Sequence, residues 1–250
     1  MEQPSRYHLI DGLRGLAVVN MVAYHFLFDV YILYGLLPGW REIGAVRLWQ
    51  QGICWTFILI SGLSWHLSRH RVRNGLLVNA CGLIVTAVTV LVTPGQAIWF
   101  GVLNLLGCSL LLATWAAPLL RRIPPAAGLI ASFLIFLLTR EVSRGVISLG
   151  GTVLAELPEW LYTSGWLTVF GFPAPGFTSS DYFPLLPWLF LYLAGWFAGR
   201  LLLRRPPRVL SVRVPLLGWV GRHSLLIYMI HQPVAVVAAM AVSQLMQQGV

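Results

Sequence analysis

Four ionisable residues lie within one apolar stretch, "LIDGLRGLAVVNMVAYHFLFDV" at residues 9–30: Asp11, Arg14, His25 and Asp29. Ionisable side chains inside a bilayer are costly, so they normally face the protein interior and mark function. At 100° per helical residue, Arg14 and His25 lie within about 20° of each other. Asp11 and Asp29 fall within about 60° of Arg14 on the same count. We therefore expect all four residues on one interior stripe.

The spacings within this stripe also suggest chemistry. Asp11 and Arg14 are three residues apart and can form an ion pair. Asp29 follows His25 by four residues, so its carboxylate can orient one imidazole nitrogen and raise the basicity of the other. His25 lies about 16 Å deeper than Arg14, at a rise of 1.5 Å per residue. A cation at one end and a supported base toward the other predicts a site that spans the membrane. The alternative is that both pairs only lock the helix to its neighbours.

Other apolar segments carry polar residues with two interpretations each. Asn104 in "IWFGVLNLLGCSLLL" (98–112) predicts either an interhelical hydrogen bond or a substrate contact. Asp181 and Tyr182 in "SSDYFPLLPWL" (179–189) predict either a contact to a substrate at the outer edge or a simple helix N-cap. Trp188 in the same segment fits the interfacial belt of tryptophans found at helix ends.

The last apolar segment, "GRHSLLIYMIHQPVAVV" (221–237), places Ser224, Tyr228 and His231 on one helical face. Polar faces on the first and last segments together predict a common interior pocket. The chain contains no GxSxG, HExxH or P-loop motif, so covalent catalysis by Ser or Cys has no support. A His/Asp base with an Arg suits proton abstraction from a hydroxyl or amine that attacks an activated acyl group.

Composition determines which elements must position these residues. The chain has 250 residues, of which 58% are hydrophobic and 10% are charged, against about a quarter charged in soluble domains. We therefore expect an all-α integral membrane bundle. Seven spans are predicted, near residues 9–33, 46–67, 75–93, 98–118, 124–139, 183–203 and 215–245.

The chain has 17 arginines and no lysine, and the arginines gather in short linkers between the spans. The linkers "SRHRVR" (68–73), "RR" (121–122) and "RLLLRRPPRVLSVR" (200–213) fall on one side of seven spans, the side of the N-terminus. This excess of arginine predicts that the N-terminus is cytoplasmic and that the chain ends on the outer side. This pattern indicates orientation and lipid head-group contact rather than a nucleic-acid partner. His66 and His70 lie in or beside the first linker and fit a basic cap better than a metal pair. The three cysteines have no metal-site spacing, so no metal is expected.

Residues 140–182 interrupt the pattern of spans. This segment is apolar but repeatedly broken by Gly and Pro. It predicts an interfacial or re-entrant segment on the outer face of a single transmembrane domain covering residues 1–250. A pair of short additional spans is the alternative.

The chain resembles the bacterial members of the heparan-α-glucosaminide N-acetyltransferase catalytic family, of the transmembrane acyltransferase superfamily. The similarity is carried by "HLIDGLRGLAVVNMVAYHFLFD", "FILISGLS", "WFGVLNLLGCSLLL", "SSDYFPLLPWLFLYLAGWFAG" and "HSLLIYMIHQPV". The spacing of Arg14 and His25 also resembles that in the acyltransferase type 3 family. Asn104 departs from the pattern, because relatives often carry His there. The extra spans and lumenal domain of the lysosomal enzymes are absent, so their heparan substrate is not carried over.

The resemblance implies transfer of an acyl group, expected to be acetyl, from cytoplasmic acyl-CoA to a sugar or other envelope acceptor across a bacterial inner membrane. His25, Asp29 and Arg14 would be catalytic, and the donor would meet Arg14, Asp11, Arg69 and Arg71. The acceptor would meet Asn104, Asp181, Tyr182, Trp188, Tyr228 and His231. The alternatives are a proton-coupled transporter, in which the polar stripe is a solute path, and a non-catalytic membrane interaction protein. A homodimer is left open.

Overall fold

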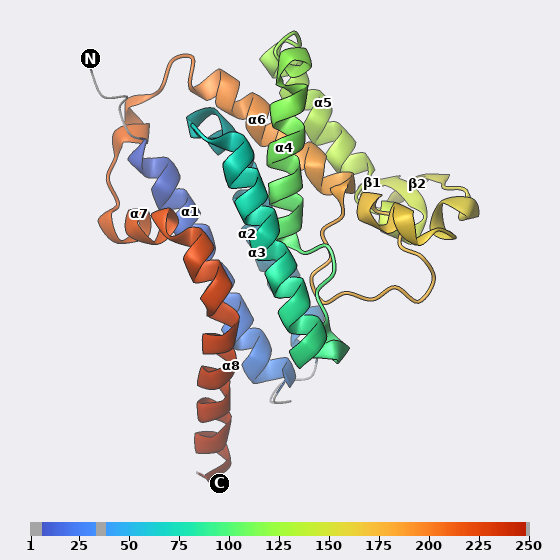
Figure 1. Cartoon of the computed structure of the whole chain (residues 1–250), viewed down its shortest axis with the longest axis vertical. Coiled ribbons are helices and arrows are strands. Elements are labelled where there is room, and N and C mark those ends of the chain that lie inside the picture. Colours follow the sequence, from blue (N-terminus) through green and yellow to red (C-terminus); the bar gives the residue numbers. More distant parts are fainter. Residues whose placement is uncertain (1–6, 34–38, 249–250) are drawn as a thin grey trace. The chain divides into compact units, whose positions relative to one another are not determined.

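The computed structural model describes residues 7–33 and 39–248, and helices dominate it (Figure 1). Six helical segments among these residues have the length and hydropathy needed to cross a membrane. They are His8–Tyr31, Arg71–Val92, Val102–Leu120, Pro125–Arg144, Leu185–Leu202 and Ser224–Val242. The predicted class, an all-α polytopic membrane bundle, is therefore confirmed.

The predicted second span forms a helix, α2 (Gly44–Ser64), but α2 is not among the six apolar helices. Its 21 residues are long enough to cross, yet Arg47, Gln50 and Gln51 make its first half polar. The chain divides within α2 into two compact units. Residues 1–60 and 206–250 form the first unit, and residues 61–205 form the second.

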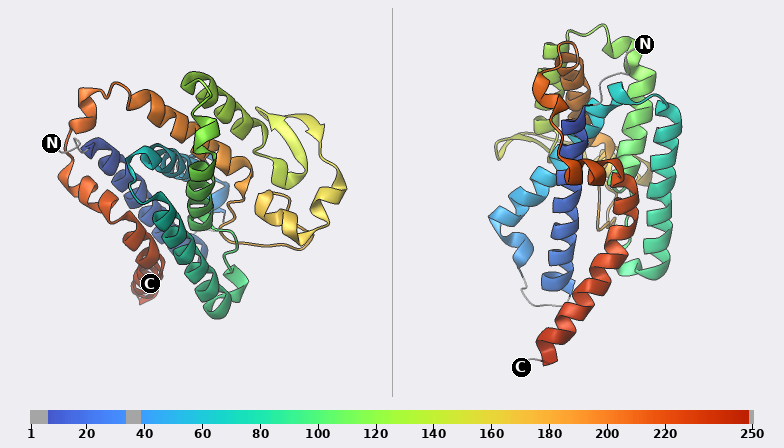
Figure 2. Two further views of the ribbon diagram at one scale, coloured as in Figure 1. Left: turned by 45° about the horizontal axis from the view of Figure 1, so that its top comes forward. Right: turned by 90° about the vertical axis from the view of Figure 1, so that its left-hand side faces the viewer.

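In the first unit, α1 (His8–Phe28) packs against α7 (Pro215–Arg222) and α8 (Ser224–Gln248), as Figure 2 shows. Leu13, Leu16 and Val19 form the outer face of α1, with exposed fractions of 40%, 46% and 44%. The four ionisable residues lie away from this apolar face, and each is at least partly buried. The predicted interior stripe is thereby confirmed.

Two glycines let α1 and α7 meet backbone to backbone. A Cβ on Gly15 would lie 1.9 Å from the carbonyl oxygen of Leu217, and one on Gly221 would lie 1.8 Å from that of Asp11. Neither position has room for a side chain, so this close crossing requires glycine. The crossing also explains why the predicted last span, 215–245, is wrong as a single helix. The chain turns at His223 after α7 has contacted α1, and α8 begins only then.

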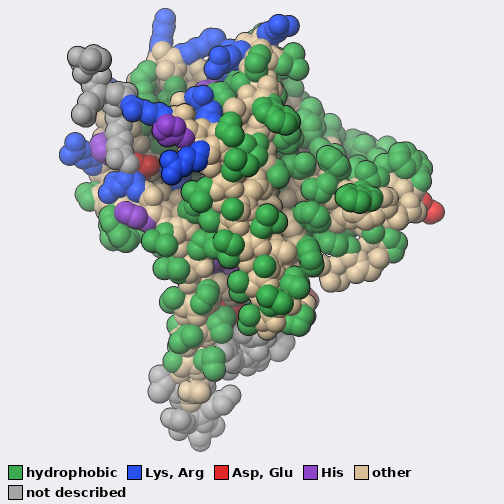
Figure 3. All heavy atoms as spheres, viewed as in Figure 1, with side chains coloured by type: hydrophobic (Ala, Val, Ile, Leu, Met, Phe, Trp, Pro, Cys, Tyr) green, Lys and Arg blue, Asp and Glu red, His purple; other side chains and the backbone are tan. Residues whose placement is uncertain are grey.

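In the second unit, α3 (Arg71–Val92) packs on α4 (Val102–Leu120), and α5 (Pro125–Leu138) packs on α6 (Leu185–Leu202). Arg200, in the last turn of α6, closes the α4–α5 turn. Its guanidinium donates hydrogen bonds to the carbonyl oxygens of Leu120 (3.1 Å), Ile123 (3.0 Å) and Arg121 (3.2 Å). Arg71 at the start of α3, Arg121 at the end of α4 and Arg200 at the end of α6 therefore lie at one end of this unit. Figure 3 shows that hydrophobic side chains (green) cover much of the surface in view, as expected for helices that face lipid.

Residues 140–182 form no additional span among the described residues. After a 3-10 turn at Val142–Arg144, the strands β1 (Val146–Leu149) and β2 (Thr152–Glu156) pair as an antiparallel hairpin. Two 3-10 segments follow, Glu159–Tyr162 and Gly165–Phe170. Trp160 is 65% exposed and Trp166 is 89% exposed. Exposed tryptophans of this kind suit a membrane–water interface, so the interfacial position stays a prediction.

Candidate active site

The first and last transmembrane helices bring two imidazoles together. The rings of His25, on α1, and His231, on α8, have centroids 4.9 Å apart and are inclined at 60°. Tyr24 lies beside His25, with ring centroids 5.8 Å apart, and Tyr228 lies beside His231, at 5.2 Å. The structure therefore brings His25 and His231 together, whereas the common interior pocket predicted for these two helices stays a prediction.

Asp29 has a different partner from the one predicted. Its carboxylate, only 1% exposed, accepts hydrogen bonds from Nε2 of Gln232 at 3.2 and 3.3 Å. The expected orienting bond from Asp29 to His25 is not formed, because α1 widens into a π-helical turn at Asp29–Leu33 and the carboxylate turns toward α8. Turns of this kind often occur at functional sites. Gln232 was not predicted, and its position directly after His231 was the signal that could have found it.

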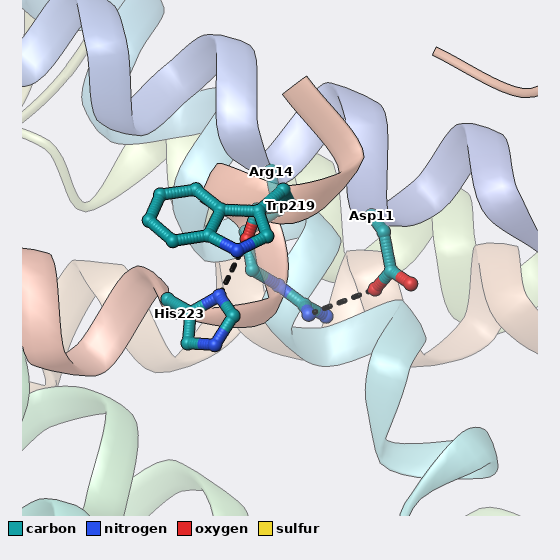
Figure 4. Close-up of polar contacts among 4 residues, drawn as sticks. All are labelled: Asp11, Arg14, Trp219 and His223. Atoms are coloured by element: carbon teal, nitrogen blue, oxygen red, sulfur yellow. Dashed lines mark hydrogen bonds and ion pairs between the residues drawn. The ribbon is translucent and has the colours of Figure 1, made fainter. Parts of the chain in front are cut away.

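Arg14 lies nearer the start of α1, where α7 covers it. Its Nη1 lies 3.5 Å from Oδ1 of Asp11, which confirms the predicted ion pair. Figure 4 draws the Asp11–Arg14 ion pair together with Trp219 of α7 and with His223, the residue that follows α7. These two rings have centroids 4.6 Å apart, and Nδ1 of His223 lies 2.9 Å from the carbonyl oxygen of Trp219. The Arg14 guanidinium can meet an anion, and neither Trp219 nor His223 was predicted.

Two other predicted donor contacts belong to the second unit. Arg71 donates from Nε to the carbonyl oxygen of Trp65 at 3.0 Å, and its guanidinium lies 4.0 Å from the centroid of that indole. Arg69 is exposed. Arg71 is therefore held in place by an aromatic ring, whereas Arg69 is open to solvent or to an anionic group.

Asp181 caps a helix, but a different one from its own. Its Oδ2 accepts a hydrogen bond of 3.2 Å from the backbone N–H of Val102, the first residue of α4, whereas the N-cap of α6 is Pro184. Burial raises the pKa of the Asp181 carboxyl to about 6, against a smaller lowering by that hydrogen bond. This bond supports the capping interpretation of Asp181.

The remaining predicted acceptor residues make internal contacts in the second unit. The Asn104 side chain lies against α3, where a Cβ on Gly82 would come within 2.6 Å of its Oδ1. Tyr182 donates its hydroxyl hydrogen to the carbonyl oxygen of Thr168. Trp188 packs its ring on Phe136 and Phe183, with centroids 5.6 and 4.8 Å apart. The close approach of Asn104 to Gly82 of α3 favours the helix-packing interpretation of Asn104 over a substrate contact.

Comparison with known protein families finds one that matches most of the chain. The family described as "Heparan-alpha-glucosaminide N-acetyltransferase, catalytic" matches residues 6–233, which include Arg14, His25 and His231. The chain belongs to this family. No curated protein and no solved structure matches the chain.

Membership of the heparan-α-glucosaminide N-acetyltransferase catalytic family identifies the chain as a membrane-embedded transferase. The matched region runs through both compact units and ends two residues after His231. The His25–His231 pair and the Asp29–Gln232 pair therefore both lie inside the region that defines the family.

Proposed function

We propose that the chain transfers an acetyl or similar acyl group from cytoplasmic acyl-CoA to a hydroxyl or amine of an envelope acceptor, such as an amino sugar. The observation that carries the proposal is the α1–α8 imidazole pair, His25 with His231 at 4.9 Å, within a chain of this family. Imidazole can take a proton from the attacking group or carry the acyl group itself. The acyl group would reach the pair from the end of α1 that holds Arg14.

Arg14 supports this direction of entry. Coenzyme A is polyanionic, and the planar Arg guanidinium recognises phosphate oxygens through paired hydrogen bonds. Oδ1 of Asp11 lies 3.5 Å from Nη1 of Arg14 and holds the guanidinium in place. Arg14 and His25 are eleven residues apart on one helix, or about 16 Å. This separation suits a donor whose charged end stays near the helix start while its thioester points inward.

The first test is acyl-CoA binding by the purified full chain in detergent or nanodiscs. Wild type is expected to bind radiolabelled acetyl-CoA saturably, and Arg14→Ala is expected to weaken binding by about tenfold or more, in line with loss of a charge-assisted hydrogen bond. Arg144→Ala is the matched control, because Arg144 is 80% exposed in its side chain and pairs only locally with Glu141. Absence of saturable binding by wild type would exclude the donor and the proposed reaction.

The second test is transfer. Wild type is expected to move the label from acetyl-CoA to glucosamine or a related amine, and His25→Ala is expected to lose this activity while keeping its acetyl-CoA affinity. Solute flux without acetyl-CoA turnover would instead favour the transporter alternative. A His25→Ala protein that changes only in thermal stability would favour a structural role for the pair.

A further inference from the structure

His231 is a buried imidazole with one nitrogen engaged and the other without a partner among the described residues. The residue is 7% exposed, and its Nδ1 lies 2.6 Å from the carbonyl oxygen of Tyr228. A carbonyl oxygen only accepts, so Nδ1 carries the hydrogen of the neutral ring and Nε2 keeps its lone pair. Within the part of the chain that the structure describes, Nε2 has no hydrogen-bond partner.

Gln232, the next residue along α8, also has one polar atom engaged and one unpaired among the described residues. Gln232 uses its Nε2 to donate to both oxygens of Asp29, which fixes the direction of the amide. Its Oε1 is then a second buried acceptor without a partner among the described residues. Both atoms lie where α8 meets α1, since His231 adjoins His25 and Gln232 adjoins Asp29, one turn further along α1. Native proteins leave few buried polar atoms unpaired, because each costs about 1–3 kcal/mol.

We propose that these two unpaired atoms receive hydrogens of the acceptor group, and that His231 is the general base of the transfer. The inference rests on the proposed function and deepens it. Two unpaired acceptors on consecutive residues of α8 suit a primary amine, which offers more than one N–H, better than a hydroxyl, which offers a single O–H. The carbonyl of Tyr228 does for His231 what Asp29 was expected to do for His25, because it fixes the tautomer that leaves a basic nitrogen facing the site.

The amine nitrogen attacks the thioester carbonyl carbon as Nε2 of His231 takes its proton, and a carbon–nitrogen bond forms. The carbon–sulfur bond breaks, its electron pair stays on the coenzyme sulfur, and the imidazolium of His231 returns the proton to that sulfur. This assignment leaves His25 free to stand beside the acyl group. Gln232 acts as a positioning residue through Asp29 and as a contact for the second amine hydrogen.

The test is the pH dependence of kcat/KM for acetyl transfer to glucosamine by the full chain. The ionisable groups in contact with His231 or Gln232 are His25 on α1, Asp29 in the π-helical turn after α1, and Tyr228 on α8, so the variants leave these three unchanged. His231→Gln is expected to lower kcat/KM by about 10²–10⁴, the usual contribution of a general base. It is also expected to remove the acidic limb of the wild-type profile while acetyl-CoA affinity is retained. His70→Gln, an exposed histidine in the second unit, should keep both the rate and the limb.

His231→Asn provides a second variant in case His231→Gln fails to fold. Its amide can still donate to the Tyr228 carbonyl, but it places no base at the position of Nε2. Loss of the acidic limb in either folded variant supports the inference. A folded variant that keeps both the wild-type kcat/KM and the acidic limb of the pH profile would overturn the role of His231 and leave the proposed function standing. A wild type that binds no acetyl-CoA would overturn both.

Discussion

Replacing Gln232 by Leu tests the pairing that joins α1 to α8. Gln232 is the partner of a carboxylate that is 1% exposed, through two hydrogen bonds of 3.2 and 3.3 Å. Leu has a similar size but no hydrogen-bond donor, so the Asp29 carboxylate would stay buried and lose both hydrogen bonds from residue 232. Hydrogen bonds to charged groups contribute about 1.5–3 kcal/mol. We therefore expect Gln232→Leu to lower the free energy of unfolding by about 2–3 kcal/mol, which lowers Tm by about 4–12 °C in a chain of this size.

A double-mutant cycle separates this pairing from general packing effects. Asp29→Leu combined with Gln232→Leu removes both polar groups, and such paired replacements are often close to neutral. The double variant should therefore be more stable than the sum of the single effects predicts, by at least about 1.5 kcal/mol, and the measurement is thermal unfolding of purified protein in one detergent. Asp29→Asn should be mild, because its amide oxygen still accepts from Gln232. Single effects that add to within about 0.5 kcal/mol would refute the coupling.

Three further predictions concern the positions where packing and burial are tightest. Gly15→Ala should force α1 and α7 apart and lower the free energy of unfolding by about 1–3 kcal/mol or more. Gly52→Ala, whose Cβ would meet nothing within 4 Å, should lower it little. Equal losses in thermal unfolding would refute the close crossing. Gly82→Ala should destabilise the protein by displacing Asn104, and adding Asn104→Ala should restore part of the loss without changing acetyl-CoA affinity; a loss of affinity would return Asn104 to the substrate contacts. The Asp181 carboxyl, whose pKa is raised from 3.8 to about 6, should contribute stability that is present below pH of about 4 and lost as pH rises through about 6. Asp181→Asn should remove that pH dependence in melts across this range, and a dependence that persists would contradict it.

Much of α1 was predictable because helical geometry decides which residues share a face. The interior stripe and the Asp11–Arg14 pair depend only on spacing within one helix. The partner of Asp29 depends on α8, about 200 residues away, and on a π-helical turn that no local pattern indicates. Spacing alone therefore predicted a bond to His25 where the structure has one to Gln232.

The helices at the other end of the chain show a similar limit. Residues 215–245 read as one continuous span because their hydropathy is unbroken. The break at His223 follows from the contact between Gly221 and the Asp11 backbone, which is a long-range contact. Asp181 was correctly placed at a helix start, but the helix that it caps, α4, begins 79 residues earlier in the chain.

The central claim is that the site around His25 passes an acyl group across the membrane. The most direct measurement uses the full chain in sealed proteoliposomes, with radiolabelled acetyl-CoA outside and glucosamine enclosed inside. Wild type should label the enclosed glucosamine, and His25→Ala should not, although it still binds acetyl-CoA. Labelling that is equal in wild type and His25→Ala, or that occurs only when donor and acceptor share one side, would contradict the claim.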